Sequence, residues 1–155
     1  MSLSKAQWAQ VKQGLSWSRG TVYLKCDDYL IAAQVQQIKM KLVVMVYVDG
    51  AFKGINAWRG KESELAEMGA IARRFYRLKR IGLSAKTAAF ERIWGKEAGN
   101  KKCYLDKDCY TSPEFATPGA FITHIKKHNP SIELLDGDRY NALRDLQRAQ
   151  EAAHG

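Results

Sequence analysis

The sequence predicts a single α+β domain in which an antiparallel meander of three to four strands packs against several helices. Period-2 alternation of β-forming residues, a later switch to helical periodicity, and turn residues between the segments predict this class. A chain of 155 residues is long enough for one hydrophobic core. We expect a short helix and the meander over residues 1–58, followed by a helical pair with a basic face over residues 60–98. Residues 101–155 are expected to form a loop, a helix, a short strand and a C-terminal helix.

The first elements follow from local signals. Ser4 and Gln7 form a capping-box pattern, and apolar residues recur after them at helical spacing, which predicts a helix over residues 4–13. Asp27-Asp28 is a turn signal, and Asp49-Gly50 is a strong hairpin signal. The β-forming runs around these turns predict strands over residues 21–26, 29–37, 38–48 and 51–56. In the clearest of them, we expect Met40, Leu42, Val44, Val46 and Val48 on one face.

The middle of the chain changes to a helical period. An apolar stripe predicts one continuous helix over residues 62–79, and Ser84 is the expected N-cap of a second helix. Residues 101–118 are expected to form a loop, with a possible short hairpin between Cys103 and Cys109.

The C-terminal elements have clearer boundaries. Thr117-Pro118 is an N-cap followed by a first-turn proline, and Asn129-Pro130 ends the helix that begins there. Residues 131–135 are expected to form a strand. Asp138 is the expected cap of a last helix, with Tyr140, Leu143 and Leu146 facing inward.

Positive charge is the main functional signal. The net charge is +9, and residues 59–102 hold twelve basic and five acidic residues. On the helix expected over residues 62–79, the arginines lie away from the apolar stripe, where guanidinium groups match phosphate geometry. The expected binding residues, with no catalytic or metal-binding residue among them, are Arg73, Arg74, Arg77, Arg80, Lys101 and Lys102. The alternative is a solvated helix face whose arginines serve solubility and helix formation.

A second pattern has the residue types of a zinc site. Phe115, Phe121, His124 and His128 have a spacing that resembles the second half of a Cys-Cys-His-His zinc finger, with Cys103 and Cys109 upstream. The two cysteines are separated by five residues, where about two to four are typical, and Pro113 and Pro118 interrupt the pattern. Surface histidines and free cysteines are the competing interpretation, so a zinc-dependent module stays an alternative and we expect no metal or other cofactor.

Catalytic patterns are weak. The sequence has no phosphate-binding glycine loop, GxSxG or HExxH motif. Asp27, Asp28 and Asp49 are explained by turns, and Glu62 by a helix start. We therefore expect a protein that is not an enzyme.

The longest apolar run, residues 42–48, is far shorter than the roughly 20 residues of a membrane span, and the first residues have no signal-peptide core. Together with the odd number of cysteines, this favours a cytoplasmic protein without a membrane partner.

Residues 22–31, 34–44, 50–54 and 119–129 are similar to small uncharacterised proteins of bacteriophages and prophages. The resemblance implies a context in which accessory proteins act by stoichiometric binding, many of them as inhibitors of nucleic-acid-guided defences such as CRISPR systems. With the basic charge, it predicts a binding protein in the host cytoplasm that engages a nucleoprotein defence complex. The alternative from the residues alone is a general basic nucleic-acid-binding protein.

Overall fold

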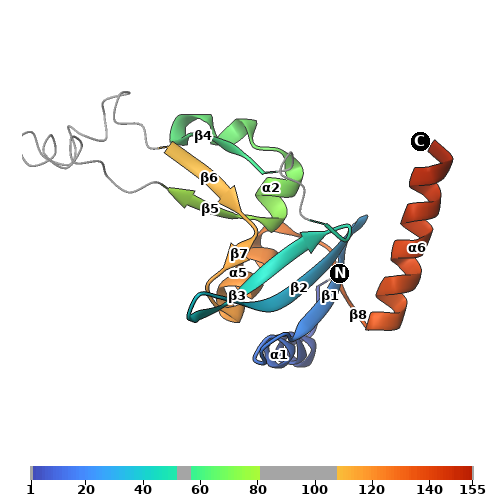
Figure 1. Cartoon of the computed structure of the whole chain (residues 1–155). Coiled ribbons are helices and arrows are strands. Elements are labelled where there is room, and N and C mark those ends of the chain that lie inside the picture. The colour runs from blue at the N-terminus through green and yellow to red at the C-terminus, as the bar shows by residue number, and fades with distance from the viewer. Residues whose placement is uncertain (1, 52–56, 81–107, 155) are drawn as a thin grey trace, which may run out of the picture.

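The computed structural model describes residues 2–51, 57–80 and 108–154, which form an α+β fold with two antiparallel sheets (Figure 1). The larger sheet has five strands in the order β7-β3-β2-β1-β8, and the smaller has three in the order β4-β6-β5. The predicted fold class is therefore confirmed. The strands are β1 (Thr21–Cys26), β2 (Tyr29–Ile38), β3 (Lys41–Val48), β4 (Arg59–Lys61), β5 (Arg77–Arg80), β6 (Asp108–Ser112), β7 (Glu114–Phe115) and β8 (Ile132–Leu135).

The meander of β1, β2 and β3 forms as the sequence predicts, with alternate residues buried along each strand. Asp49 and Gly50 both have positive φ (51° and 82°), as a tight hairpin turn requires. The expected strand over residues 38–48 is wrong at its start, because β2 turns back at Lys39 and Met40 and Ile38 pairs with Lys41. Met40 is 93% exposed, so the predicted apolar face lies in the core only from Val44 onward.

Two helices cover one face of the five-stranded sheet. Helix α1 (Lys5–Gly14) starts at Ser4, whose capping box with Gln7 is present, and α5 (Pro118–His128) starts at Thr117, whose hydroxyl accepts from the Ala120 amide at 3.1 Å. Both boundaries confirm the predictions. A single core cluster joins the helices to the sheet; its fully buried members include Val11, Leu24, Ile31, Val44, Val46, Phe115, Phe121 and Ile125. Each such apolar side chain contributes about 1.5–3 kcal/mol of burial free energy.

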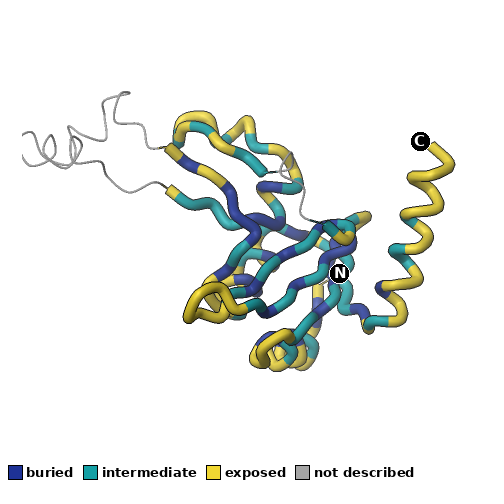
Figure 2. The backbone as a smooth tube through the Cα atoms, in the orientation of Figure 1, coloured by how far each residue is buried: buried dark blue, intermediate teal, exposed yellow. Residues whose placement is uncertain are grey.

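The last helix, α6 (Gly137–His154), leaves the body of the protein and is exposed along most of its length (Figure 2). Its first turns are anchored by Tyr140, which stacks on Tyr23 with ring centroids 4.3 Å apart. Asp136 accepts a hydrogen bond from the Arg139 amide at 2.7 Å, so the cap lies two residues before the predicted Asp138. Leu146, predicted to face inward, is 60% exposed, whereas the next residue, Gln147, still donates to Asp49 Oδ1 at 3.0 Å. The prediction for Leu146 is therefore wrong.

The continuous helix predicted over residues 62–79 is wrong. The chain instead forms a 3-10 helix, η2 (Glu62–Glu67), a short helix α2 (Ala70–Phe75), and strand β5. Gly69 and Tyr76 have extended backbones at the two ends of α2, which separates the three elements. Strand β5 gains its ladder hydrogen bonds from β6, a segment predicted to be loop. The pairing partner lies far away in the sequence, so local periodicity could not indicate it.

The chain passes from the three-stranded sheet to the five-stranded sheet at Pro113. Strand β6 lies in the three-stranded sheet and β7 in the five-stranded sheet, with Pro113 between them. The Pro113 carbonyl accepts from the Val46 amide at 3.0 Å, which joins the step to β3. The remainder of the returning strand after Ala51, the helix expected from Ser84, and Lys101 to Cys103 lie outside the described residues.

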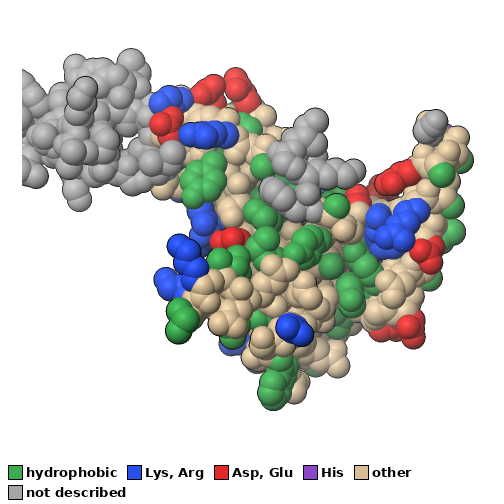
Figure 3. All heavy atoms as spheres, viewed as in Figure 1, with side chains coloured by type: hydrophobic (Ala, Val, Ile, Leu, Met, Phe, Trp, Pro, Cys, Tyr) green, Lys and Arg blue, Asp and Glu red, His purple; other side chains and the backbone are tan. Residues whose placement is uncertain are grey.

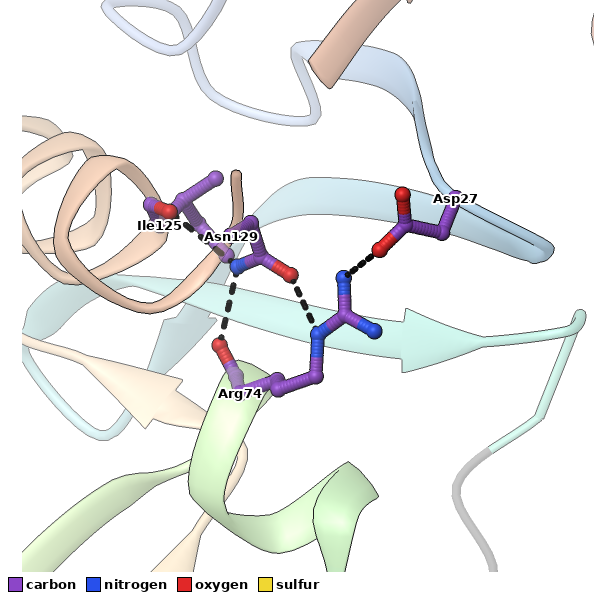
Figure 4. Close-up of polar contacts among 4 residues, drawn as sticks. All are labelled: Asp27, Arg74, Ile125 and Asn129. Atoms are coloured by element: carbon purple, nitrogen blue, oxygen red, sulfur yellow. Dashed lines mark hydrogen bonds and ion pairs between the residues drawn. The ribbon is translucent and has the colours of Figure 1, made fainter. Parts of the chain in front are cut away.

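A buried polar clamp holds three segments together (Figure 4). Asn129, 5% exposed, follows α5, and its side-chain oxygen accepts from Arg74 Nε at 2.8 Å while its Nδ2 donates to the Arg74 carbonyl at 3.2 Å. Arg74 Nη2 also contacts the Asp27 carboxylate at 2.6 Å, in the β1–β2 turn. The guanidinium lies 5.3 Å from the centre of the Tyr29 ring, so cation–π attraction adds to the contact. The clamp therefore joins the end of α2 to α5 and to the meander.

We predict that Asn129→Ala lowers the free energy of unfolding by about 1–3 kcal/mol, because it leaves the partly buried Arg74 Nε and Arg74 carbonyl without their partner. Chemical denaturation measures the loss. Lys127→Ala, an exposed change on the same helix, is the matched control and is expected to stay within about 0.5 kcal/mol of the parent. Equal stability of the two variants would show that the clamp contributes nothing.

Candidate nucleic-acid interface

The structure does not bring the predicted arginines together on one helix face. Arg73 lies on α2 and donates through Nη2 to the carbonyls of Ala66 and Met68, both at 3.1 Å, so it caps the end of η2. Arg74 belongs to the buried clamp. The expected four-arginine face is therefore corrected: the continuous helix that would have aligned these side chains is absent.

Strand β5 carries the other two arginines. Arg77 and Arg80 are three positions apart in the strand, so their side chains point to opposite faces of the sheet. Arg80 pairs with Glu62 through a 2.9 Å contact and is engaged within the protein. Lys101 and Lys102 lie outside the described residues.

One face of the three-stranded sheet gathers a different set of basic residues. The strand register places Tyr110 directly between Arg59 on β4 and Lys79 on β5. Directly opposed residues on paired strands share a face, and so do residues two positions apart. The same face therefore also carries Lys61 with its partner Asp108, and Arg77 with its partner Ser112. We call this set the basic–aromatic face; its members are Arg59, Lys61, Arg77, Lys79 and Tyr110.

The aromatic ring is accessible in the middle of this set. Tyr110 is 38% exposed, and Lys79 Nζ lies 5.9 Å from the centre of its ring. Lys61 contacts Asp108 at 2.6 Å and thereby lowers the pKa of that carboxyl. Arg59 and Lys79 form no ion pair within the described part of the chain, although the charge of Arg59 also lowers the pKa of Asp108. Basic and hydrophobic side chains lie side by side over these strands (Figure 3).

The opposite face of the same sheet is packed. Cys109 is fully buried and Thr111 is 6% exposed, and the Thr111 hydroxyl accepts from the Trp58 amide at 2.7 Å. The sheet is thus packed on this side at Cys109 and Thr111, whereas Arg59, Lys61 and Tyr110 are exposed on the other side. Cations around an exposed aromatic ring can bind phosphates while the ring stacks on a base.

The spacing of basic residues in the sequence indicates the basic–aromatic face, but the helical spacing of apolar residues in the same segment favoured a helix instead. Arg77 and Lys79 are two residues apart, as are Arg59 and Lys61, which is the spacing of side chains on one side of a strand. Tyr110 had no comparable signal, because its neighbours on the face come from two distant segments.

The residues with zinc-finger spacing form an aromatic cluster. The ring of His124 lies 5.3 Å from that of Phe115 and 4.3 Å from that of His128, measured between centroids. Cys109 is buried in β6, and Cys103 lies outside the described residues. Within the described ranges, no three His, Cys, Asp or Glu side chains are grouped so that they could hold a metal ion. The described residues therefore give the zinc alternative no support.

The acidic residues near the turns have structural roles in the described chain. Asp49 Oδ1 accepts from the Leu30 amide and from Gln147 Nε2, each at 3.0 Å. Cys26 is fully buried, and burial raises the pKa of its thiol to about 12, so it stays protonated at neutral pH. The expectation that the protein is not an enzyme stays a prediction.

Comparison with protein-family models, curated proteins and solved structures finds no match to this chain. Among the described residues, no helix combines the length and apolar character needed to cross a bilayer.

We predict that acidification destabilises the fold through His124. Burial first, then the neighbouring charges of His128 and Lys127, lower its pKa from 6.5 to about 4. Between these values the unfolded chain binds a proton that the folded protein excludes, so stability is greatest above pH 6.5 and falls as the pH drops toward 4. Because the imidazole is partly exposed, solvent screens the effect, and the loss stays below about 3 kcal/mol.

Denaturant titrations at pH 7 and pH 4.5 measure this effect. His124→Gln, which cannot titrate, is expected to flatten the pH dependence relative to the parent, whereas His154→Gln at the exposed end of α6 should leave it unchanged. An identical pH dependence in His124→Gln and the parent would contradict the prediction.

Proposed function

We propose that this protein binds nucleic acid, free or within a nucleoprotein complex, through the basic–aromatic face and without turnover. The observation that carries the proposal is the cross-strand row in which Tyr110 lies between Arg59 and Lys79. An aromatic side chain on an open sheet face accepts any base by stacking, and the flanking cations neutralise the adjoining phosphates. The row favours an unpaired strand, because bases stacked inside a duplex do not present their flat faces.

Electrostatics supports the same ligand. The net charge of +9 attracts a polyanion over a distance. Arg59 and Lys79 form no ion pair among the described residues, and Asp108 is the carboxylate whose pKa the charge of Arg59 lowers. The packed opposite face keeps the three strands in register, so the ring and its cations are held in place before a ligand arrives.

A host defence complex is the target that we propose to test first. The context of this proposal is the phage origin expected from residues 22–31 and 119–129, which the comparisons do not test. In it, the basic–aromatic face would occupy an exposed strand of an RNA- or DNA-guided complex such as a CRISPR effector. Purifying the tagged protein from the host and identifying the bound macromolecules tests the target; recovery of a bare acidic protein, with no nucleic acid, would contradict it.

We predict that Tyr110→Ala weakens binding to single-stranded nucleic acid by about 1–3 kcal/mol, the usual contribution of one stacked base. Fluorescence anisotropy with labelled DNA and RNA strands measures the affinity. Tyr110→Phe keeps the ring and is expected to retain binding, while the stability of both variants is checked by thermal melting. Equal affinities of the Ala variant and the parent would show that the Tyr110 ring does not contact the nucleic acid.

We also predict that the double change Arg59→Ala/Lys79→Ala reduces the salt dependence of binding. Each lost phosphate contact decreases the slope of log K against log salt by about 0.7 for a single strand, so the pair should decrease it by about 1.4. The matched control is Arg139→Ala/Arg148→Ala, which removes two cations from α6. The same slope in both double variants would show that the charge acts nonspecifically.

A further inference from the structure

The tip of the β2–β3 hairpin exposes apolar side chains between lysines. Its five residues, which we call the hairpin tip, are Ile38, Lys39, Met40, Lys41 and Leu42. Met40 is 93% exposed, Leu42 49% and Ile38 37%. Three large apolar side chains on one protruding turn leave apolar surface in water that the fold itself does not use.

Turn formation does not explain these residues. The turn at Asp27 and the hairpin at Asp49-Gly50 place Asp and Gly where φ is positive, as tight turns prefer. The hairpin tip instead places a lysine there, with φ of 56° at Lys39, and a methionine next to it. A left-handed backbone costs a side chain with a β-carbon about 1–2 kcal/mol. The two turns at Asp27 and Asp49-Gly50 thus use ordinary turn residues, whereas a basic residue has positive φ at the hairpin tip and also at Arg19 before β1, where φ is 64°.

The strands below the tip hold it rigidly. Strands β2 and β3 pair continuously from Ile31 with Val48 to Ile38 with Lys41, so the tip is the end of a two-stranded ribbon. Lys39 and Lys41 are exposed and form no ion pair within the described part of the chain. Basic and hydrophobic side chains continue along one edge of the molecule from the three-stranded sheet to this hairpin (Figure 3). The tip is therefore placed to touch the same polyanion as the basic–aromatic face.

We propose that the hairpin tip enters a groove of double-stranded nucleic acid, where Met40 inserts as an apolar wedge at a base step and Lys39 and Lys41 contact the flanking phosphates. Proteins of the β-ribbon class place strands in the minor groove of DNA, and methionine is among the side chains that unstack base steps from that groove. Charge complementarity selects this occupant, since the apolar wedge lies directly between two free cations. The inference rests on the proposed function and extends it to duplex DNA or RNA next to an unpaired strand.

The test uses a duplex that carries 2-aminopurine, whose fluorescence rises when its base unstacks, and the corresponding single strand. The full-length parent is expected to bind the duplex and raise its fluorescence. Met40→Ala should abolish the rise and weaken duplex binding at least about fivefold, which is the effect of losing one buried methionine side chain. Met40→Leu, which keeps an apolar wedge, should retain both, and Lys39→Ala/Lys41→Ala should lower the salt slope for the duplex. Met40 is almost fully exposed, so the folded state is unaffected by its replacement.

The outcomes separate this inference from the proposed function. Met40→Ala should bind the single strand like the parent, because that contact depends on Tyr110. A parent that binds the single strand but leaves the duplex unbound or its fluorescence unchanged would overturn the inference and keep the proposed function. A parent that binds neither would overturn both. Binding to vesicles of anionic lipid that disappears in Met40→Ala, without duplex binding, would identify the tip as a membrane contact and overturn the inference.

Discussion

The contact between Arg74 and Asn129 determines how the second half of the fold is arranged. Asn129 binds both the guanidinium and the backbone carbonyl of Arg74, at the residue where α2 is about to end. The chain then becomes extended at Tyr76 and continues into β5. Because β5 completes the three-stranded sheet, a buried amide after α5 fixes the position from which the basic–aromatic face is built. Breaking such a buried pair leaves unpaired polar groups, so the contact is needed even though its net contribution is modest.

Elements whose signals are local could be predicted from the sequence. Ser4 and Thr117 cap α1 and α5 through contacts three residues away, and Asp49-Gly50 turns the chain within two residues. Strand β5 and strand β6 could not be predicted this way, because each is stabilised by a partner about thirty residues distant. The stripe of Leu65, Met68, Phe75 and Leu78 fits a helix, yet Gly69 and the pairing of β5 divide it. Here tertiary pairing prevailed over local periodicity.

The charge of the candidate site was predictable, but its geometry was not. Arg59, Arg77 and Lys79 of the candidate face lie within the basic segment that the sequence analysis singled out, and its role in binding stays a prediction. Other arginines of that segment contact groups within the protein. Arg74 binds Asp27 and Asn129, and Arg80 binds Glu62. A positive residue contributes to binding only if no carboxylate of its own chain already neutralises it, and sequence spacing does not reveal such long-range pairs.

The difference between cations paired within the protein and unpaired cations determines which of them we expect to bind a polyanion. Lysine is strongly hydrated and rarely chosen for buried pairs, while arginine forms fixed multidentate contacts inside a protein. In the described chain, the most engaged cation is Arg74, whereas Lys39, Lys41 and Lys79 remain accessible on a ribbon tip and an open sheet. Both surfaces combine accessible cations with an apolar or aromatic group, Met40 in one and Tyr110 in the other. A solubility role explains the cations, but it does not explain why each set surrounds a group that water disfavours. That pairing is why we propose a ligand for these two surfaces and attribute a structural role to the arginines of α2.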